Sequence, residues 1–113
     1  MAIIAYALPI VAGQTESARS FAAELDEAGH RARYEELNRR AGVRRHLEWV
    51  QATPTGDQLI VAFEADRPEA LGRPFVDDEY DRWWRTRVQR LHGFDPATAG
   101  ALPVLCYSWP AEG

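Results

Sequence analysis

The sequence lacks several residue types and patterns that would point to particular classes of protein. It has 113 residues, one cysteine (Cys106) and no lysine. A single cysteine excludes an intrachain disulfide. The apolar stretch 1–11 has no preceding basic region and no small-residue cleavage site, and it is too short to cross a bilayer. We therefore expect a cytoplasmic protein that has no contact with membranes.

Motifs for phosphate binding and for nucleophilic catalysis are also missing. The sequence contains neither a glycine-rich phosphate loop nor a nucleophile elbow, and we expect no bound cofactor. The net charge of −4 argues against a nucleic-acid partner. Arginines do cluster between Arg31 and Arg45. We interpret them as a solvated helix face, with an anion site at the helix end as the alternative.

Apolar residues make up 46% of the chain and are spread along it, which predicts one globular domain over 1–113. Residues 2–10 predict a strand. Both its odd-numbered and its even-numbered positions are apolar, as in a strand that is covered on both faces. Residues 43–53 and 58–65 predict two strands joined by a tight turn at 54–57. The alternating segment 103–109 predicts a fourth strand.

Two amphipathic stretches lie between these strands. Apolar residues at three- and four-residue spacing from 15 to 41 predict one long helix, or two with a bend near Gly29. Asp77 or Asp78 is expected to cap a further helix that runs to about His92 and stops at Gly93. The order β-α-β-β-α-β predicts an α+β ferredoxin-like plait, in which helices cover one face of a four-stranded antiparallel sheet.

The second face of this sheet is also expected to be apolar, and no segment of the chain remains to cover it. A second copy of the chain is the simplest cover, so the sequence predicts a homodimer.

The order of elements, the length and the two-faced strands resemble the dimeric α/β-barrel superfamily. The stretch 75–95, with Tyr80-Asp81-Arg82-Trp83-Trp84-Arg85 inside it, resembles small uncharacterised actinobacterial proteins of this type. The resemblance implies two plaits packed sheet to sheet, each with a pocket beside its sheet. The superfamily includes cofactor-free monooxygenases of aromatic polyketides, cyclases, isomerases and haem-degrading enzymes, and the fold does not choose among them.

His46, His92 and Asp81 are the candidates for acid-base catalysis. His46 lies two residues before Glu48 in a predicted strand, so both side chains share one face. They form a base and its orienting carboxylate if that face lines a pocket, and an ordinary polar pair if it meets solvent. His92 either complements the dipole at its helix end, paired with Asp95, or acts as an acid/base with its tautomer fixed by Asp81 or Asp95.

Aromatic residues are abundant and suggest a small hydrophobic or aromatic ligand. Trp84 lies on the core stripe of its helix, whereas Trp83 and Trp109 either line a pocket or fill the dimer seam. The acidic residues near Asp78 are explained by helix capping. A metal site would need a nearby histidine, so none is predicted. The predicted ligand-binding residues are Tyr6, Trp49, Tyr80, Trp83, Arg87 and Tyr107.

Three functions follow as hypotheses. The first is a small-molecule enzyme of the dimeric-barrel type, a cofactor-free monooxygenase or cyclase that acts on an aromatic or polyketide-like substrate. The second is a dimeric protein that binds a ligand without catalysis. The third is a haem-binding or haem-degrading protein, although Asn38, the one asparagine, does not stand in the Asn-Trp-His pattern of the haem-degrading group.

Overall fold

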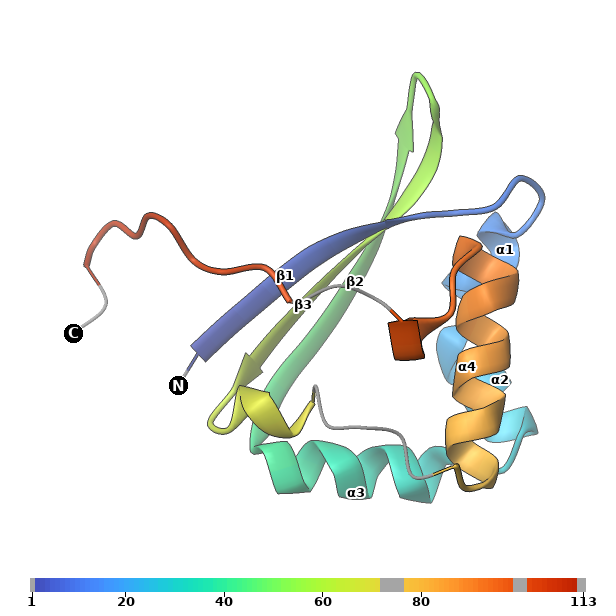
Figure 1. Ribbon diagram of the computed structural model, residues 1–113, viewed down its shortest axis with the longest axis horizontal. Coiled ribbons are helices and arrows are strands. Elements are labelled where there is room, and N and C mark those ends of the chain that lie inside the picture. Colours follow the sequence, from blue (N-terminus) through green and yellow to red (C-terminus); the bar gives the residue numbers. More distant parts are fainter. Residues whose placement is uncertain (1, 72–76, 99–101, 112–113) are drawn as a thin grey trace.

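The computed structural model describes residues 2–71, 77–98 and 102–111 (Figure 1). It is an α+β fold with a three-stranded sheet and four α-helices. In chain order, the elements are β1 (Ala2–Pro9), α1 (Thr15–Arg19), α2 (Phe21–Glu27), α3 (Arg31–Ala41), β2 (Val43–Thr53), β3 (Gly56–Ala65) and α4 (Glu79–His92). Short 3-10 turns lie at Pro68–Ala70 and Pro96–Thr98. The first three predicted strands are therefore confirmed.

The sheet has the order β1-β3-β2, and both pairs are antiparallel. The hairpin that the turn residues predicted is β2–β3, with Thr53 opposite Gly56. Helices α1, α2 and α4 lie on one side of the sheet, to its right in Figure 1, and α3 runs along the end of the sheet at which β2 begins. β1 forms an edge, because β3 is its one neighbour in the described part of the sheet.

The predicted four-stranded ferredoxin-like plait is wrong. Residues 102–111 contain no strand, and Val104, Leu105, Tyr107 and Trp109 are all exposed. Cys106 is exposed as well. The physical reason is that a strand is stabilised by a ladder partner and by burial of its side chains. The alternating sequence of 103–109 favours an extended backbone. It does not by itself provide a neighbouring strand or bury the side chains.

The stretch 15–41 forms three successive helices, α1, α2 and α3, where the sequence predicted one long helix or two with a bend near Gly29. The chain breaks at Gly29, which has a φ of 74°, a left-handed value that favours glycine. A further break falls at Ser20, between α1 and α2. The predicted ends of α4 are confirmed: Asp78 accepts a hydrogen bond from the Asp81 N–H at 2.8 Å, and Gly93 forms a left-handed C-cap.

The two faces of the sheet differ in their cover. Toward the helices, Leu59 and Val61 of β3 are buried with Ile10 and Ala18. On the other face, Ile3 is 58% exposed and Trp49 is 50% exposed. By strand alternation, the apolar residues of this open face are Ile3, Ala5, Ala7, Leu47, Trp49, Ile60 and Ala62. The centre of the open face is therefore apolar and in part exposed, and it is flanked by the Arg45–Glu64 ion pair and the Gln51–Gln58 hydrogen bond.

The C-terminal end of α4 is tied to the end of β1. The His92 Nδ1–H donates to the Pro9 carbonyl at 2.7 Å, and the Val11 N–H donates to the Leu91 carbonyl at 2.7 Å. His92 is buried here, and burial lowers its pKa, with a smaller lowering from the charge of Arg87. His92 therefore connects two elements of the fold.

We expect the free energy of unfolding to decrease as the pH falls through the normal range of histidine. A buried His92 with a lowered pKa binds a proton less readily than the same residue in the unfolded chain, so acid favours unfolding. The stabilisation is complete above about pH 6.5 and is lost below it. His92→Asn, which keeps a donor for Pro9 but does not titrate, should flatten this dependence in urea unfolding measured at about pH 7.5 and about pH 5.5. An unchanged slope in the variant would contradict this role.

Candidate functional site

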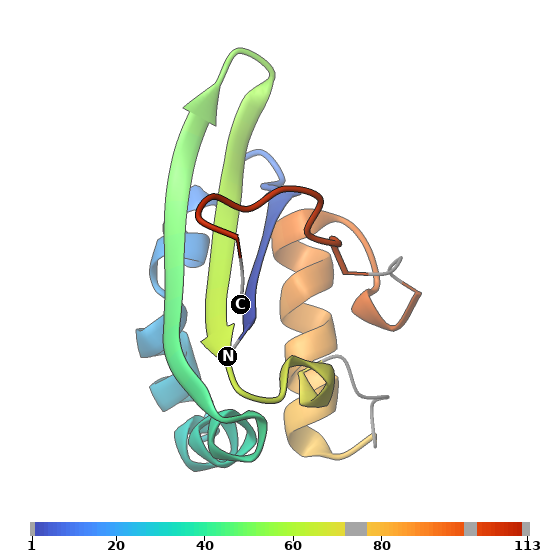
Figure 2. The same cartoon turned by 90° about the vertical axis from the view of Figure 1, so that its left-hand side faces the viewer.

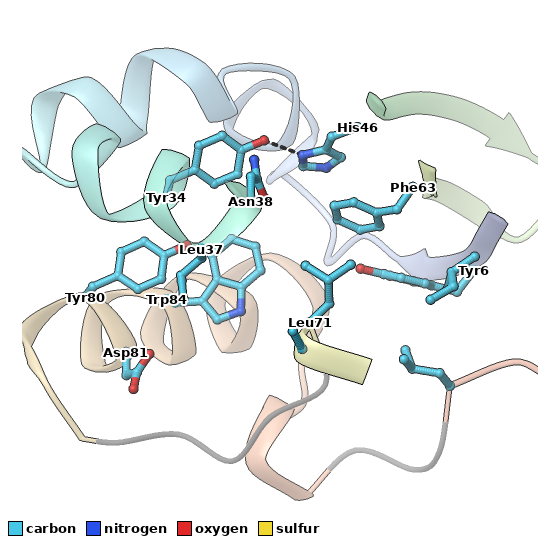
Figure 3. Close-up of a pocket in the computed structure, with 13 residues that line it drawn as sticks. Tyr6, Tyr34, Leu37, Asn38, His46, Phe63, Leu71, Tyr80, Asp81 and Trp84 are labelled. Carbon is cyan, nitrogen blue, oxygen red and sulfur yellow. Dashed lines mark hydrogen bonds between the residues drawn. The ribbon is translucent and has the colours of Figure 1, made fainter. Parts of the chain in front are cut away.

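A cavity of about 190 Å³ lies between the helix-facing side of the sheet and helices α3 and α4 (Figure 3). Its lining is mostly apolar and aromatic. The sheet contributes Ile4, Tyr6, His46 and Phe63; α3 contributes Tyr34, Leu37 and Asn38; α4 contributes Tyr80, Asp81 and Trp84; and Ala70, Leu71 and Leu102 complete it.

Strand register brings the sheet residues of the cavity together. Ile4 of β1 and His46 of β2 both lie opposite Phe63 of β3, so these three side chains form one row across the sheet. Tyr6 and Glu48 form the next row, on either side of Val61. Because paired residues of neighbouring strands share a face, both rows point toward the helices.

His46 is the centre of a hydrogen-bonded chain. Its Nδ1 lies 2.5 Å from the Tyr34 Oη, and its Nε2 lies 2.8 Å from the Glu48 Oε2. The His46 and Glu48 side chains are 11% and 19% exposed. With Glu48 ionised, the His46 Nε2–H donates to the carboxylate, and Nδ1 accepts the Tyr34 O–H. The sequence left open whether this pair meets a pocket or solvent, and in the structure it lies at the cavity.

Burial keeps the two phenols of the cavity protonated. It raises the pKa of Tyr6 to about 12, with a smaller contribution from the negative charge of Glu48. Burial also raises the pKa of Tyr34, although a hydrogen bond from Asn38 lowers it in part. Both side chains are therefore neutral O–H donors near neutral pH.

Ring contacts hold these side chains in place. His46 stacks on Phe63, with centroids 4.3 Å apart and an interplanar angle of 20°. Phe21 of α2 meets Tyr34 edge-on at 5.5 Å and Trp84 at 5.9 Å. Such contacts fix ring orientation, so the hydrogen-bonded chain is supported on two sides.

Four of the predicted site residues line the cavity: Tyr6, His46, Tyr80 and Asp81. Tyr80 stacks parallel to Trp84 at 6.5 Å, with an interplanar angle of 9°. Asp81 is buried at the α4 side of the cavity.

The other predicted site residues lie elsewhere. His92 bonds to Pro9 at the end of β1, and Trp49 is half-exposed on the open sheet face. Trp83 packs against His30 at 5.3 Å, and Tyr107 is exposed in the C-terminal segment. The sequence predicted these residues from their chemistry. Their positions depend on the packing of α4 for His92 and Trp83, on strand alternation for Trp49, and on the C-terminal segment for Tyr107.

Sequence reasoning missed Tyr34 and Asn38 as site residues. Tyr34 is one of the residues at three- and four-residue spacing that predict the helical stretch 15–41, and that spacing does not indicate a functional role. The available signal was the four-residue spacing of these two polar side chains, which places both on one face of α3 beside Leu37.

Arg87 is buried, 3% exposed, with its guanidinium 4.5 Å from the centre of the Phe21 ring. The Arg87 Nε lies 3.4 Å from Glu24 Oε2, and the Arg90 Nη2 lies 2.9 Å from Glu24 Oε1. Burial lowers the pKa of Arg87, while the charge of Glu24 acts in the opposite direction. The Arg87 Nη2 is buried without a hydrogen-bond partner among the described residues. Glu24 thus provides the negative charge that balances the buried guanidinium of Arg87.

We expect Glu24→Gln to destabilise the fold by about 3 kcal/mol, because it leaves the buried Arg87 charge uncompensated. The matched control is Glu27→Gln on the exposed side of the same helix, which should change stability by less than about 0.5 kcal/mol. Chemical denaturation of both variants measures the difference. Equal stability of the two variants would show that Arg87 does not depend on Glu24.

Within residues 2–71, 77–98 and 102–111, no group of three or more His, Cys, Asp or Glu side chains is placed to hold a metal ion. No helix in these ranges combines the length and apolar character needed to cross a membrane. Comparison of the chain with protein-family models, curated proteins and solved structures gave no match.

Proposed function

We propose that this protein is a small-molecule enzyme that moves a proton on a compact aromatic substrate bound in the cavity, without a bound cofactor. The observation that carries the proposal is the chain Tyr34–His46–Glu48, which ends at the wall of an aromatic cavity. A base, its orienting carboxylate and a phenol in hydrogen-bond contact form the usual arrangement for acid-base work.

The volume of the cavity indicates the size of the group that it could enclose. An apolar cavity of about 150 Å³ holds benzene, whereas pockets for drug-sized ligands are about 300–1,000 Å³. The value here, about 190 Å³, favours a single aromatic ring with small substituents. Within the aromatic or polyketide-like class, this supports a one-ring substrate. Haem, with four pyrrole rings, is much larger, so the haem hypothesis is not carried forward.

The proposed mechanism begins with proton removal. Tyr34 Oη takes a proton from the substrate as its own proton passes to His46 Nδ1. Glu48 then stabilises the imidazolium through Nε2. The substrate is left as an enolate or phenolate. The neutral Tyr6 O–H, on the same cavity wall, supplies a hydrogen-bond donor for that anion. A resonance-stabilised anion is the shared first intermediate of a cyclisation and of a direct reaction with dioxygen.

We expect the protein to accelerate deuterium incorporation into the methyl group of acetophenone in D2O, followed by NMR. Acetophenone is a one-ring probe whose own exchange is slow. Tyr34→Phe and His46→Gln should each reduce the catalysed rate by about 10²- to 10⁴-fold, because each interrupts the proton path. The matched control, Tyr107→Phe, changes an exposed phenol outside the cavity and should leave the rate unchanged.

A non-catalytic ligand-binding protein is the second candidate, and the mostly apolar lining of the cavity favours it. It predicts that one-ring compounds bind with an affinity that His46→Gln leaves within about twofold, since apolar contact alone holds the ligand. Calorimetric titration with acetophenone measures this. Binding without accelerated exchange would support this candidate and reject the enzyme.

A further inference from the structure

The outer edge of β1 is open to pairing. β3 pairs with all eight residues of β1, from Ala2 to Pro9, and no described strand lies on the other side. Natural edge strands are usually protected by charged residues, bulges or a covering element. β1 contains no charged residue, and its one proline is the last residue, Pro9. This edge is therefore a template for a further strand.

A second segment of the same chain has apolar side chains that are exposed and could be buried by pairing with such an edge. Residues 102–109, which we name the C-terminal arm, include no charged residue and match β1 in length. Its large apolar side chains are 88% exposed at Val104, 61% at Leu105, 76% at Tyr107 and 84% at Trp109. A run of exposed apolar side chains on one segment marks an interaction surface.

The arm begins at Leu102, which lines the cavity. From there it extends away from its own body on the side of the sheet opposite the helices (Figure 1 and Figure 2). That is the side of the apolar open face, where Ile3 and Trp49 are uncovered. A second copy approaching this face would meet the arm and the face together. Its β1 carries both an open edge and the apolar residues Ile3, Ala5 and Ala7 of its own open face.

We propose that two copies of this chain exchange their C-terminal arms, each arm adding as a fourth strand to the open β1 edge of the other copy. Reciprocal exchange uses each arm and each edge once, so it closes as a two-fold dimer and leaves neither exposed. Pairing of an arm with its own β1 would cover the edge and still leave the open face bare. Leu102, the first residue of the arm, lines the cavity, so exchange also fixes part of the cavity wall.

The first test is sedimentation of the full-length chain over a range of concentrations. The wild-type chain should be a dimer. Leu105→Pro with Tyr107→Pro should raise the dimer dissociation constant more than about tenfold, because proline removes two ladder donors. The matched control, Leu105→Thr with Tyr107→Val, keeps the backbone donors and the strand propensity, so it should dimerise better than the proline variant. A monomeric wild type, or equal dissociation constants for the two variants, would overturn the proposal.

The second test uses Cys106, the one cysteine, to separate exchange from self-pairing. A chain carrying Ala5→Cys and Cys106→Ser has its thiol on β1, whereas the wild type has its thiol on the arm. The two chains are mixed and treated with a short bismaleimide. Arm exchange predicts a cross-linked product that contains one chain of each kind, identified by mass.

A single chain carrying Ala5→Cys together with the natural Cys106 completes this experiment. Self-pairing predicts that this chain is bridged within one monomer and that the mixed product does not form. Absence of the mixed product, in a sample that sedimentation shows to be dimeric, overturns the proposal. Neither test depends on ligand binding or catalysis, so a negative result here would not reject the proposed function. A failure of the proposed function would likewise not reject arm exchange.

Discussion

Antiparallel pairing of β3 with both β1 and β2 decides which side chains point toward the helices and which do not. The register places Phe63 between Ile4 and His46, and Val61 between Tyr6 and Glu48. A shift of one residue would turn His46 and Glu48 to the open face and bring Leu47 and Trp49 toward the helices. The core, the cavity and the polar chain at its wall all depend on this register.

Charged groups then reinforce the packing that the register permits. Glu24 of α2 meets Arg87 and Arg90 of α4 and so connects two of the helices that pack beside the sheet. His92 connects the end of α4 to Pro9 of β1. Both interactions involve buried groups, for which an unmade partner is costly. They therefore fix the position of α4 more strictly than apolar contact alone, and α4 supplies one wall of the cavity.

The hydrogen-bonded residues at the cavity come from two different kinds of secondary structure, a strand and a helix. His46 and Glu48 share a face because a strand repeats every two residues, and Tyr34 and Asn38 share a face because a helix nearly repeats every four. The two sets meet where the stretch 15–41 returns to the sheet at β2. Rings from α2, α4 and β3 surround them. These residues together form a hydrogen-bonded polar cluster on a mostly apolar cavity wall.

The sequence by itself determined three strands, the β2–β3 hairpin, the helical character of 15–41 and both ends of α4, because each depends on local periodicity, turn residues or caps. It also identified His46 with Glu48, since their spacing on a strand is local. Tertiary structure alone decided that this pair meets Tyr34, that His92 bonds to Pro9, and that Arg87 lies buried beside Glu24. It also decided that 102–109 forms no strand within one copy. A strand requires a partner edge, and an alternating sequence does not specify where that edge lies.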